Sequence, residues 1–180
     1  MKVYITFLML VVAIVAIGFI IKITGQQASA TDLQLNETAL IKPSAQTQLK
    51  WHSSNELEKL QAQNPKQVIV DIYTDWCKWC KVMDEQTFTN KALIEYLNKH
   101  FYMVKFNAET KENIKFKNST YSFVNSGRKG HNQLAQTLTN GQLAFPSFVV
   151  LNEQLNTKQV IRGFKTAEEF KRAIENEMGI

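Results

Sequence analysis

The sequence predicts an α/β layer fold whose central sheet mixes parallel and antiparallel strands. Residues 67–74 (QVIVDIYT) and 101–109 (FYMVKFNAE) are β-branched and almost wholly apolar, which is typical of strands buried on both faces of a sheet. A helical pattern separates these two runs. The chain then closes with two further strand patterns, at 146–153 and 158–164, that fit a hairpin, and with an amphipathic helix.

The N-terminal residues 3–23 are a nearly unbroken apolar stretch, long enough to cross a bilayer as a helix. Lys2 precedes the stretch, so the positive-inside rule places the N-terminus in the cytoplasm and the remainder outside. A cleaved signal peptide is the alternative, because residues 28–30 (ASA) fit a cleavage site. The apolar stretch exceeds the usual signal-peptide core, which favours an uncleaved membrane anchor. Both interpretations put the following domain outside the cytoplasm; cleavage near Ala30 would give a secreted or periplasmic protein.

Residues 24–48 are rich in Gln, Thr, Ala and Ser and show little apolar periodicity, so they are predicted to be a flexible linker. The folded domain is expected over residues 49–180. In a chain of 180 residues that is 44% hydrophobic, this domain can bury a core of its own. The formal charge of +5 is not gathered into a basic stripe with interleaved aromatic residues, so nucleic acid is not an expected partner.

Capping signals and apolar spacing predict the helices. Ser53 with Glu56, and Thr166 with Glu169, have the spacing of capping boxes and predict two helix starts. The other helices are expected to begin at the cysteine pair, to begin near Lys91 with Leu93, Ile94 and Leu97 facing inward, and to cover residues 131–141 with Gly141 as the C-terminal cap.

Both cysteines, Cys77 and Cys80, lie in the segment DIYTDWCKWCK (71–81). As a structural clip, a disulfide over so short a loop stabilises a fold by only roughly 2 kcal/mol. A zinc site needs further ligands, and the three histidines are scattered along the chain. Covalent haem needs a histidine directly after the second cysteine, where this chain has Lys81. The pair is therefore interpreted as a redox-active dithiol that forms a Cys77–Cys80 disulfide, with no bound metal.

The segment VIVDIYTDWCKWCK (68–81) resembles the active-site region of the thioredoxin superfamily: a buried strand, an acidic residue, a tryptophan and then C-x-x-C opening a helix. Lys105, Pro146 and Gly163 match positions where that family has a lysine, a cis-proline and a glycine. The resemblance covers residues 49–178 and implies a thioredoxin fold, a central mixed sheet flanked by helices. It is nearest to exported bacterial members such as the C-terminal domain of transmembrane disulfide reductases. Two departures stand out: Lys78-Trp79 replaces Gly-Pro between the cysteines, and residues 106–145 form a longer middle stretch.

The resemblance and the chemistry of thiols together imply roles for four residues. Cys77, nearest the helix start, is expected to be the exposed nucleophile, because the helix N-terminus favours a thiolate. Cys80, one turn further on, is expected to be the resolving thiol. Asp71 is expected to be a buried proton acceptor for Cys80, with its pKa raised by desolvation and with Lys105 as its partner. The alternative for Asp71 is a carboxylate at the strand end that reaches solvent.

Further residues are candidates for contact with a substrate. Trp76 and Trp79 either cover the disulfide or contact the substrate. The basic loop at 125–131 (NSGRKGH) is a candidate for the segment that borders the substrate-binding site. Proline alone favours a trans bond, but the resemblance implies a cis Phe145–Pro146 bond with Pro146 packed against Cys77. The backbone near Phe145 would then pair with an extended client, as an added strand does.

Together these features predict a membrane-anchored or exported thiol–disulfide oxidoreductase that needs no cofactor. A reductase is expected, with client proteins that carry disulfides or thiols and with an upstream thiol electron donor. The alternatives are an oxidase or isomerase on the same fold, and a non-catalytic adaptor or chaperone-like module.

Overall fold

The structure, a computed structural model, describes residues 48–126 and 129–178. The predicted anchor at 3–23 and nearly all of the predicted linker lie outside the described residues. Within the described part, no helix is both long and apolar enough to span a bilayer.

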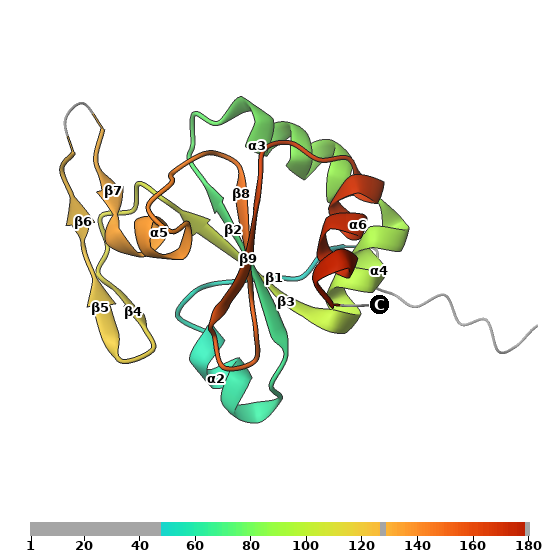
Figure 1. The fold of residues 1–180 in the computed structure, drawn as a ribbon, viewed down its shortest axis with the longest axis horizontal. Coiled ribbons are helices and arrows are strands. Elements are labelled where there is room, and N and C mark those ends of the chain that lie inside the picture. Colours follow the sequence, from blue (N-terminus) through green and yellow to red (C-terminus); the bar gives the residue numbers. More distant parts are fainter. Residues whose placement is uncertain (1–47, 127–128, 179–180) are drawn as a thin grey trace, which may run out of the picture. The chain divides into compact units, whose positions relative to one another are not determined.

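A mixed five-stranded sheet forms the centre of the domain (Figure 1). Its strand order is β1–β3–β2–β8–β9. The strands β1, β3 and β2 are parallel, whereas β8 runs antiparallel to β2, and β9 antiparallel to β8. The predicted α/β class with a mixed sheet is therefore confirmed. The bounds of the strands are Trp51–His52 for β1, Gln67–Tyr73 for β2, Phe101–Asn107 for β3, Ser147–Leu151 for β8 and Thr157–Arg162 for β9.

Alternation along the central strand β2 divides the core into two layers, because successive side chains of a strand point to opposite faces. Val68, Val70 and Ile72 join a cluster that contains residues of the helices α2 (Leu57–Gln63) and α5 (Gln133–Leu138). Ile69 joins the other cluster, which includes residues of η1, α4 and α6. Asp71 has the parity of Ile69, so its side chain lies on the second face.

Three helical segments follow one another after β2 and cover this second face together with the last helix. They are α3 (Lys78–Val82), the π-helix η1 (Met83–Thr87) and α4 (Lys91–His100), and the last helix is α6 (Ala167–Met178). The predicted starts at the cysteines and at Lys91 are confirmed, and Leu93, Ile94 and Leu97 are buried. The Thr166–Glu169 capping box is also present, with both of its reciprocal hydrogen bonds.

The first predicted helix begins later than expected. The Ser53 hydroxyl donates to the Glu56 carboxylate instead of accepting the Glu56 N–H, which donates to the Ser53 carbonyl. Residues 54–56 consequently form a turn, and α2 begins at Leu57.

The long middle stretch forms two small hairpins and α5, on the side of the sheet away from α4 and α6 (Figure 1). One hairpin joins β4 (Ile114–Phe116) to β5 (Ser119–Tyr121), and the other joins β6 (Phe123–Val124) to β7 (His131–Asn132). Asn132 connects them to α5: its side chain is fully buried, accepts the Leu134 N–H as a helix cap and donates to the Glu112 carbonyl. The helix is shorter than the predicted range 131–141, and its C-cap is Thr139. The left-handed position after this cap is Asn140 (φ 55°), not Gly141 as predicted; Gly141 (φ 77°) follows it and donates its N–H to the Gln136 carbonyl.

Candidate active site

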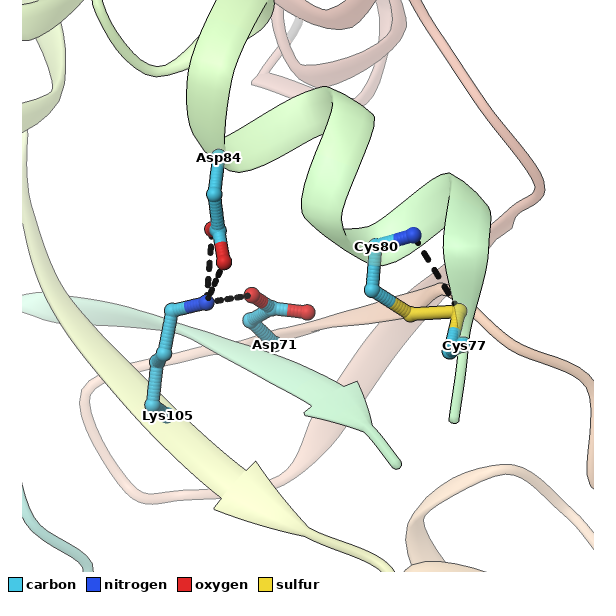
Figure 2. A network of polar contacts seen from close by, with 5 residues as sticks. All are labelled: Asp71, Cys77, Cys80, Asp84 and Lys105. Atoms are coloured by element: carbon cyan, nitrogen blue, oxygen red, sulfur yellow. Dashed lines mark hydrogen bonds and ion pairs between the residues drawn. A yellow bond between two sulfur atoms is a disulfide. The ribbon is translucent and has the colours of Figure 1, made fainter. Parts of the chain in front are cut away.

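Cys77 and Cys80 form a disulfide directly after the central strand (Figure 2). Cys77 is the N-cap of α3, and its backbone N–H donates to the Thr74 carbonyl, which turns the chain from the strand into the helix. The Cys77 sulfur accepts the Cys80 N–H at 3.1 Å. One sulfur thus lies at the start of the helix, where unpaired backbone N–H groups favour negative charge.

Both cysteines are buried in this oxidised state, with exposed fractions of 4% for Cys77 and 5% for Cys80. The expectation that Cys77 is the exposed member of the pair is therefore wrong for the disulfide form. The reason is geometric: the disulfide bond holds the Cys77 side chain against Cys80 and the first turn of the helix. The exposed groups are instead the flanking side chains of Trp76 and Trp79, at 53% and 55%.

Asp71, Lys105 and Asp84 form a charged network beneath the helix that carries the cysteines (Figure 2). Asp71 on β2 pairs in register with Lys105 on the parallel strand β3, so both side chains leave the sheet on the same face. Lys105 Nζ lies 3.3 Å from Asp71 Oδ2. It also donates to both carboxylate oxygens of Asp84, at 2.6 Å each. The predicted partnership of Asp71 with Lys105 is thus present.

The Asp71 side chain does not reach solvent, so the alternative of an exposed carboxylate at the strand end is wrong. Only 2% of the residue is exposed. The pKa of Asp71 is raised to about 7, chiefly by burial and to a smaller extent by the nearby Asp84 carboxylate, against the opposing effect of the Lys105 ammonium. Burial lowers the pKa of Lys105, but the carboxylates of Asp71 and Asp84 outweigh it and raise that pKa above its ordinary value. Asp71 can therefore exchange a proton near neutral pH.

The second carboxylate oxygen of Asp71, Oδ1, is buried and accepts no hydrogen bond within the described residues. In Figure 2 the side chain lies between Lys105 and the disulfide, with this free oxygen on the side of the cysteines. At the other end of the network, an open pocket of about 540 Å³ borders Asp84 and Lys105. The network thus joins an unpaired oxygen near the sulfurs to a solvent-accessible pair of charges.

The aromatic residues form two contacts beside the disulfide. The Trp76 ring meets the Phe145 ring edge-on, with centroids 5.7 Å apart. The Trp79 ring lies 5.3 Å from that of Phe164 in a tilted arrangement. The tryptophans therefore lie near the loops that flank β8 and β9 while remaining half exposed.

The Phe145–Pro146 bond is cis, as the family resemblance implies. Pro146 is buried, and its carbonyl accepts the N–H of Gly163, which has a φ of +77° and follows β9. Packing of Pro146 on Cys77, and pairing of the backbone near Phe145 with a client, stay predictions.

The predicted site did not include Asp84, Glu109 or Phe164, and it included Lys129 only as part of the loop at 125–131. A signal for Asp84 was present, because it follows Cys80 by four residues and so lies on the same side of a continuing helix. Glu109 accepts the Trp76 indole N–H at 2.9 Å, and the Lys129 ammonium lies 3.6 Å from the Trp76 ring centroid. Neither contact carries a sequence signal, since both join segments distant in the chain.

Comparison with known proteins identifies the family of this chain. The model of the family Thioredox_DsbH, described as a protein of unknown function, DUF255, matches residues 30–171. A curated protein, the thiol:disulfide interchange protein DsbD of Actinobacillus pleuropneumoniae serotype 5b (strain L20), is 45% identical over 40 residues. That match covers 22% of this chain and 7% of the relative, so the chain corresponds to a small part of that protein.

Three solved structures resemble the domain with a TM-score of 0.53 each, and these likenesses establish the fold. A structure titled DsbH Oxidoreductase is 19% identical and covers 77% of this chain and 90% of its own. A putative disulphide-isomerase from Bacteroides thetaiotaomicron is 20% identical and covers 72% and 91%, and a thioredoxin from Thermus thermophilus is 17% identical and covers 71% and 85%. With its Cys77–Cys80 disulfide on a thioredoxin-like fold, the chain belongs to the Thioredox_DsbH (DUF255) family.

Proposed function

We propose that the protein is a thiol–disulfide oxidoreductase that reduces protein disulfides outside the cytoplasm. The observation that carries the proposal is the Cys77–Cys80 disulfide at a helix start, above a buried carboxylate with a pKa of about 7. The names of the relatives, an oxidoreductase, a putative disulphide-isomerase and a thiol:disulfide interchange protein, agree with this chemistry.

In the first step, the thiolate of reduced Cys77 attacks one sulfur of a client disulfide. A bond forms between Cys77 Sγ and that sulfur, the client disulfide breaks, and the released client sulfur takes a proton. Exchange needs a thiolate, which is a minor form of an ordinary cysteine at neutral pH. The Cys80 N–H, which donates to Cys77 Sγ in the oxidised state, and the other free N–H groups of the helix start would stabilise the thiolate.

In the second step, Cys80 resolves the mixed disulfide. Asp71 accepts the proton of the Cys80 thiol through its free oxygen, and the Cys80 thiolate attacks Cys77 Sγ. The bond between Cys77 Sγ and the client sulfur breaks as the Cys77–Cys80 disulfide forms, and the departing client sulfur takes a proton. The client therefore leaves as a dithiol, and two electrons pass from this protein to the client. A carboxyl whose pKa is near neutral suits this role, because it takes and returns a proton at little cost.

A new cycle requires an upstream thiol donor that reduces the Cys77–Cys80 disulfide. The extracytoplasmic location rests on the apolar segment 3–23, which would anchor the chain with its C-terminal domain outside, or direct its export before cleavage near Ala30. The reducing direction rests on the resemblance to disulfide-reductase domains.

The first prediction separates the roles of the two sulfurs. Cys77→Ser should abolish reduction of insulin disulfides, whereas Cys80→Ser should accumulate mixed disulfides with clients because nothing resolves them. Non-reducing gels and mass spectrometry measure both outcomes. Trapping by the Cys77 variant but not by the Cys80 variant would reverse the assignment, and turnover retained without Cys77 would exclude the mechanism.

The reduction potential tests the direction of electron flow. A value near the roughly −270 mV of thioredoxin supports a reductase. A value near about −120 mV, as in strong oxidants, would make the protein an oxidase instead. Equilibration with defined ratios of reduced and oxidised dithiothreitol or glutathione gives the potential.

A further inference from the structure

Trp76, which directly precedes the nucleophilic cysteine, is held by three distant segments. Glu109, after β3, accepts its indole N–H at 2.9 Å, and Phe145, before β8, meets the ring edge-on. Lys129 reaches it from the loop between β6 and β7, with Nζ 3.6 Å from the ring centroid. The β6–β7 hairpin therefore extends to the border of the disulfide site and places a cation there.

The charged side chains around this border differ in whether they have an oppositely charged partner. Asp84 is paired with the Lys105 ammonium, whereas Asp75 and Glu109 accept hydrogen bonds from the neutral side chains of Asn107 and Trp76 and keep their negative charge. In the described part of the chain, neither Lys129 nor Lys78, an exposed residue between the two cysteines, forms an ion pair. Among the described residues, the ammonium groups of Lys129 and Lys78 are thus free to meet a carboxylate of another molecule, although Glu109 contacts the same Trp76 ring as Lys129.

We propose that Lys129 is a specificity residue, which selects client segments that carry an acidic side chain next to the disulfide to be reduced. This inference rests on the proposed function. Trp76 directly precedes Cys77 and is half exposed, so we expect a client disulfide at Cys77 to lie against this ring. A carboxylate one or two residues from the client sulfur would then meet Lys129, with Lys78 reinforcing the attraction. Opposite charges at the edge of an interface raise the association rate and reject like-charged partners.

The test uses model clients with one internal disulfide that are identical except for Glu, Gln or Lys beside one cysteine. The pre-reduced full chain is mixed with each peptide, and the second-order rate constant of peptide reduction is measured. At low ionic strength the Glu peptide should react about threefold faster than the Gln peptide and about tenfold faster than the Lys peptide, as expected for exposed charge pairs. The preference should fade in roughly 1 M salt, because the Debye length falls to about 3 Å.

Variants assign the preference to one residue. Lys129→Gln should bring the ratio of the Glu and Lys peptide rates close to that expected from Lys78 alone, about two to three. Lys129→Glu should bring the ratio to one or below. The matched control is Lys115→Glu, which makes the same change in net charge at an exposed position of β4 and should leave the ratio unchanged.

The ratio distinguishes selection from mere support of Trp76. If Lys129 only braced the ring, its loss would slow all three peptides alike, and the unchanged ratio would overturn the inference. An equal loss of preference in Lys115→Glu would overturn it as well, because net charge would then be the cause. If the wild type reduces all three peptides equally, the inference fails and the proposed function stands. If it reduces none, the proposed function fails and the inference falls with it.

Discussion

Asp71 is the residue whose environment most departs from that of an ordinary aspartate. Its carboxyl is buried between the sheet and the helix that carries the cysteines, with Lys105 on one side and no hydrogen bond to Oδ1 from any described residue. An isolated buried carboxylate is costly, so the group keeps its proton up to about pH 7 in the folded protein. The buried carboxyl therefore lowers the stability of the fold and provides a proton-transfer group near the sulfurs.

The second prediction follows from this pKa. The unfolded chain loses the Asp71 proton near the ordinary value of 3.8, whereas the folded chain keeps it until about pH 7. Between these values the unfolded state binds fewer protons, so this residue lowers the free energy of unfolding as pH rises from about 4 to about 7. Asp71→Asn should therefore be more stable than the wild type at pH 8, by roughly 2–4 kcal/mol, and the gain should shrink toward pH 4.

Denaturant unfolding at several pH values measures this difference. The same substitution should slow the release of clients from the mixed disulfide about 10²-fold, the lower range for a lost general base. Asp84→Asn is the control. It removes a charge that raises the pKa of Asp71, and it leaves Lys105 to pair with Asp71 alone, so the pKa of Asp71 should fall. The decrease in the free energy of unfolding that Asp71 causes should then end at a lower pH. A pH-independent effect of Asp71→Asn would contradict the assignment.

At the scale of elements, the β6–β7 hairpin depends on Gly130. A Cβ at this position would clash with the Phe123 ring and would meet the Val124 carbonyl oxygen at 2.7 Å. The Phe123 ring could rotate, but the backbone carbonyl could not yield without moving the strand. The hairpin therefore has to shift if any side chain is added there.

The third prediction is that Gly130→Ala displaces the hairpin while the central sheet persists. Lys129 would leave the Trp76 ring, and the preference for acidic peptides should fall about as far as in Lys129→Gln. Far-ultraviolet circular dichroism should change little, and the melting temperature should fall by only a few degrees. Gly141→Ala is a suitable comparison, because a Cβ there meets nothing within 4 Å and the cost comes from its positive φ alone. A preserved preference in Gly130→Ala would show that the hairpin position is not needed for it.

The sequence predicted the elements that have a strong pattern of their own. The β2 and β3 strands are long apolar runs, α4 has apolar residues at helical spacing, and α6 has a capping box. The hairpins at 114–132 were missed, because strands of two or three residues have too few positions to show alternation. The tight turn at Lys117 (φ 55°) also lacks a glycine to mark it. The two-residue β1 strand was missed for the same reason.

The residues of the candidate site also divide into those that the sequence predicted and those that it did not. The sequence indicated the cysteine pair, Asp71, Lys105 and the cis-proline, because they stand at family positions. It did not predict the burial of Cys77, which depends on the disulfide geometry. The contacts of Glu109 and Lys129 with Trp76 were also missed, since they arise only when three distant segments meet.

At the scale of the whole molecule, the fourth prediction concerns the N-terminal segment. A reporter that requires an oxidising compartment, fused after Ile180, should be active only when the C-terminal domain lies outside the cytoplasm. Carbonate washing should leave the full-length chain in the membrane, because residues 3–23 would span the bilayer. Recovery in the soluble fraction with a new N-terminus at Thr31 would show instead that the segment is a cleaved signal peptide.

The Cys77–Cys80 disulfide contains every cysteine of the chain. Alkylation of free thiols should therefore add either no label or two labels to the protein, which makes its oxidation state countable by mass in a cell extract. A single label would mark a molecule caught while joined to another thiol. Any species covalently linked through sulfur to this chain must have been attached at the active site, so isolating the linked species would identify physiological partners without a trapping mutation.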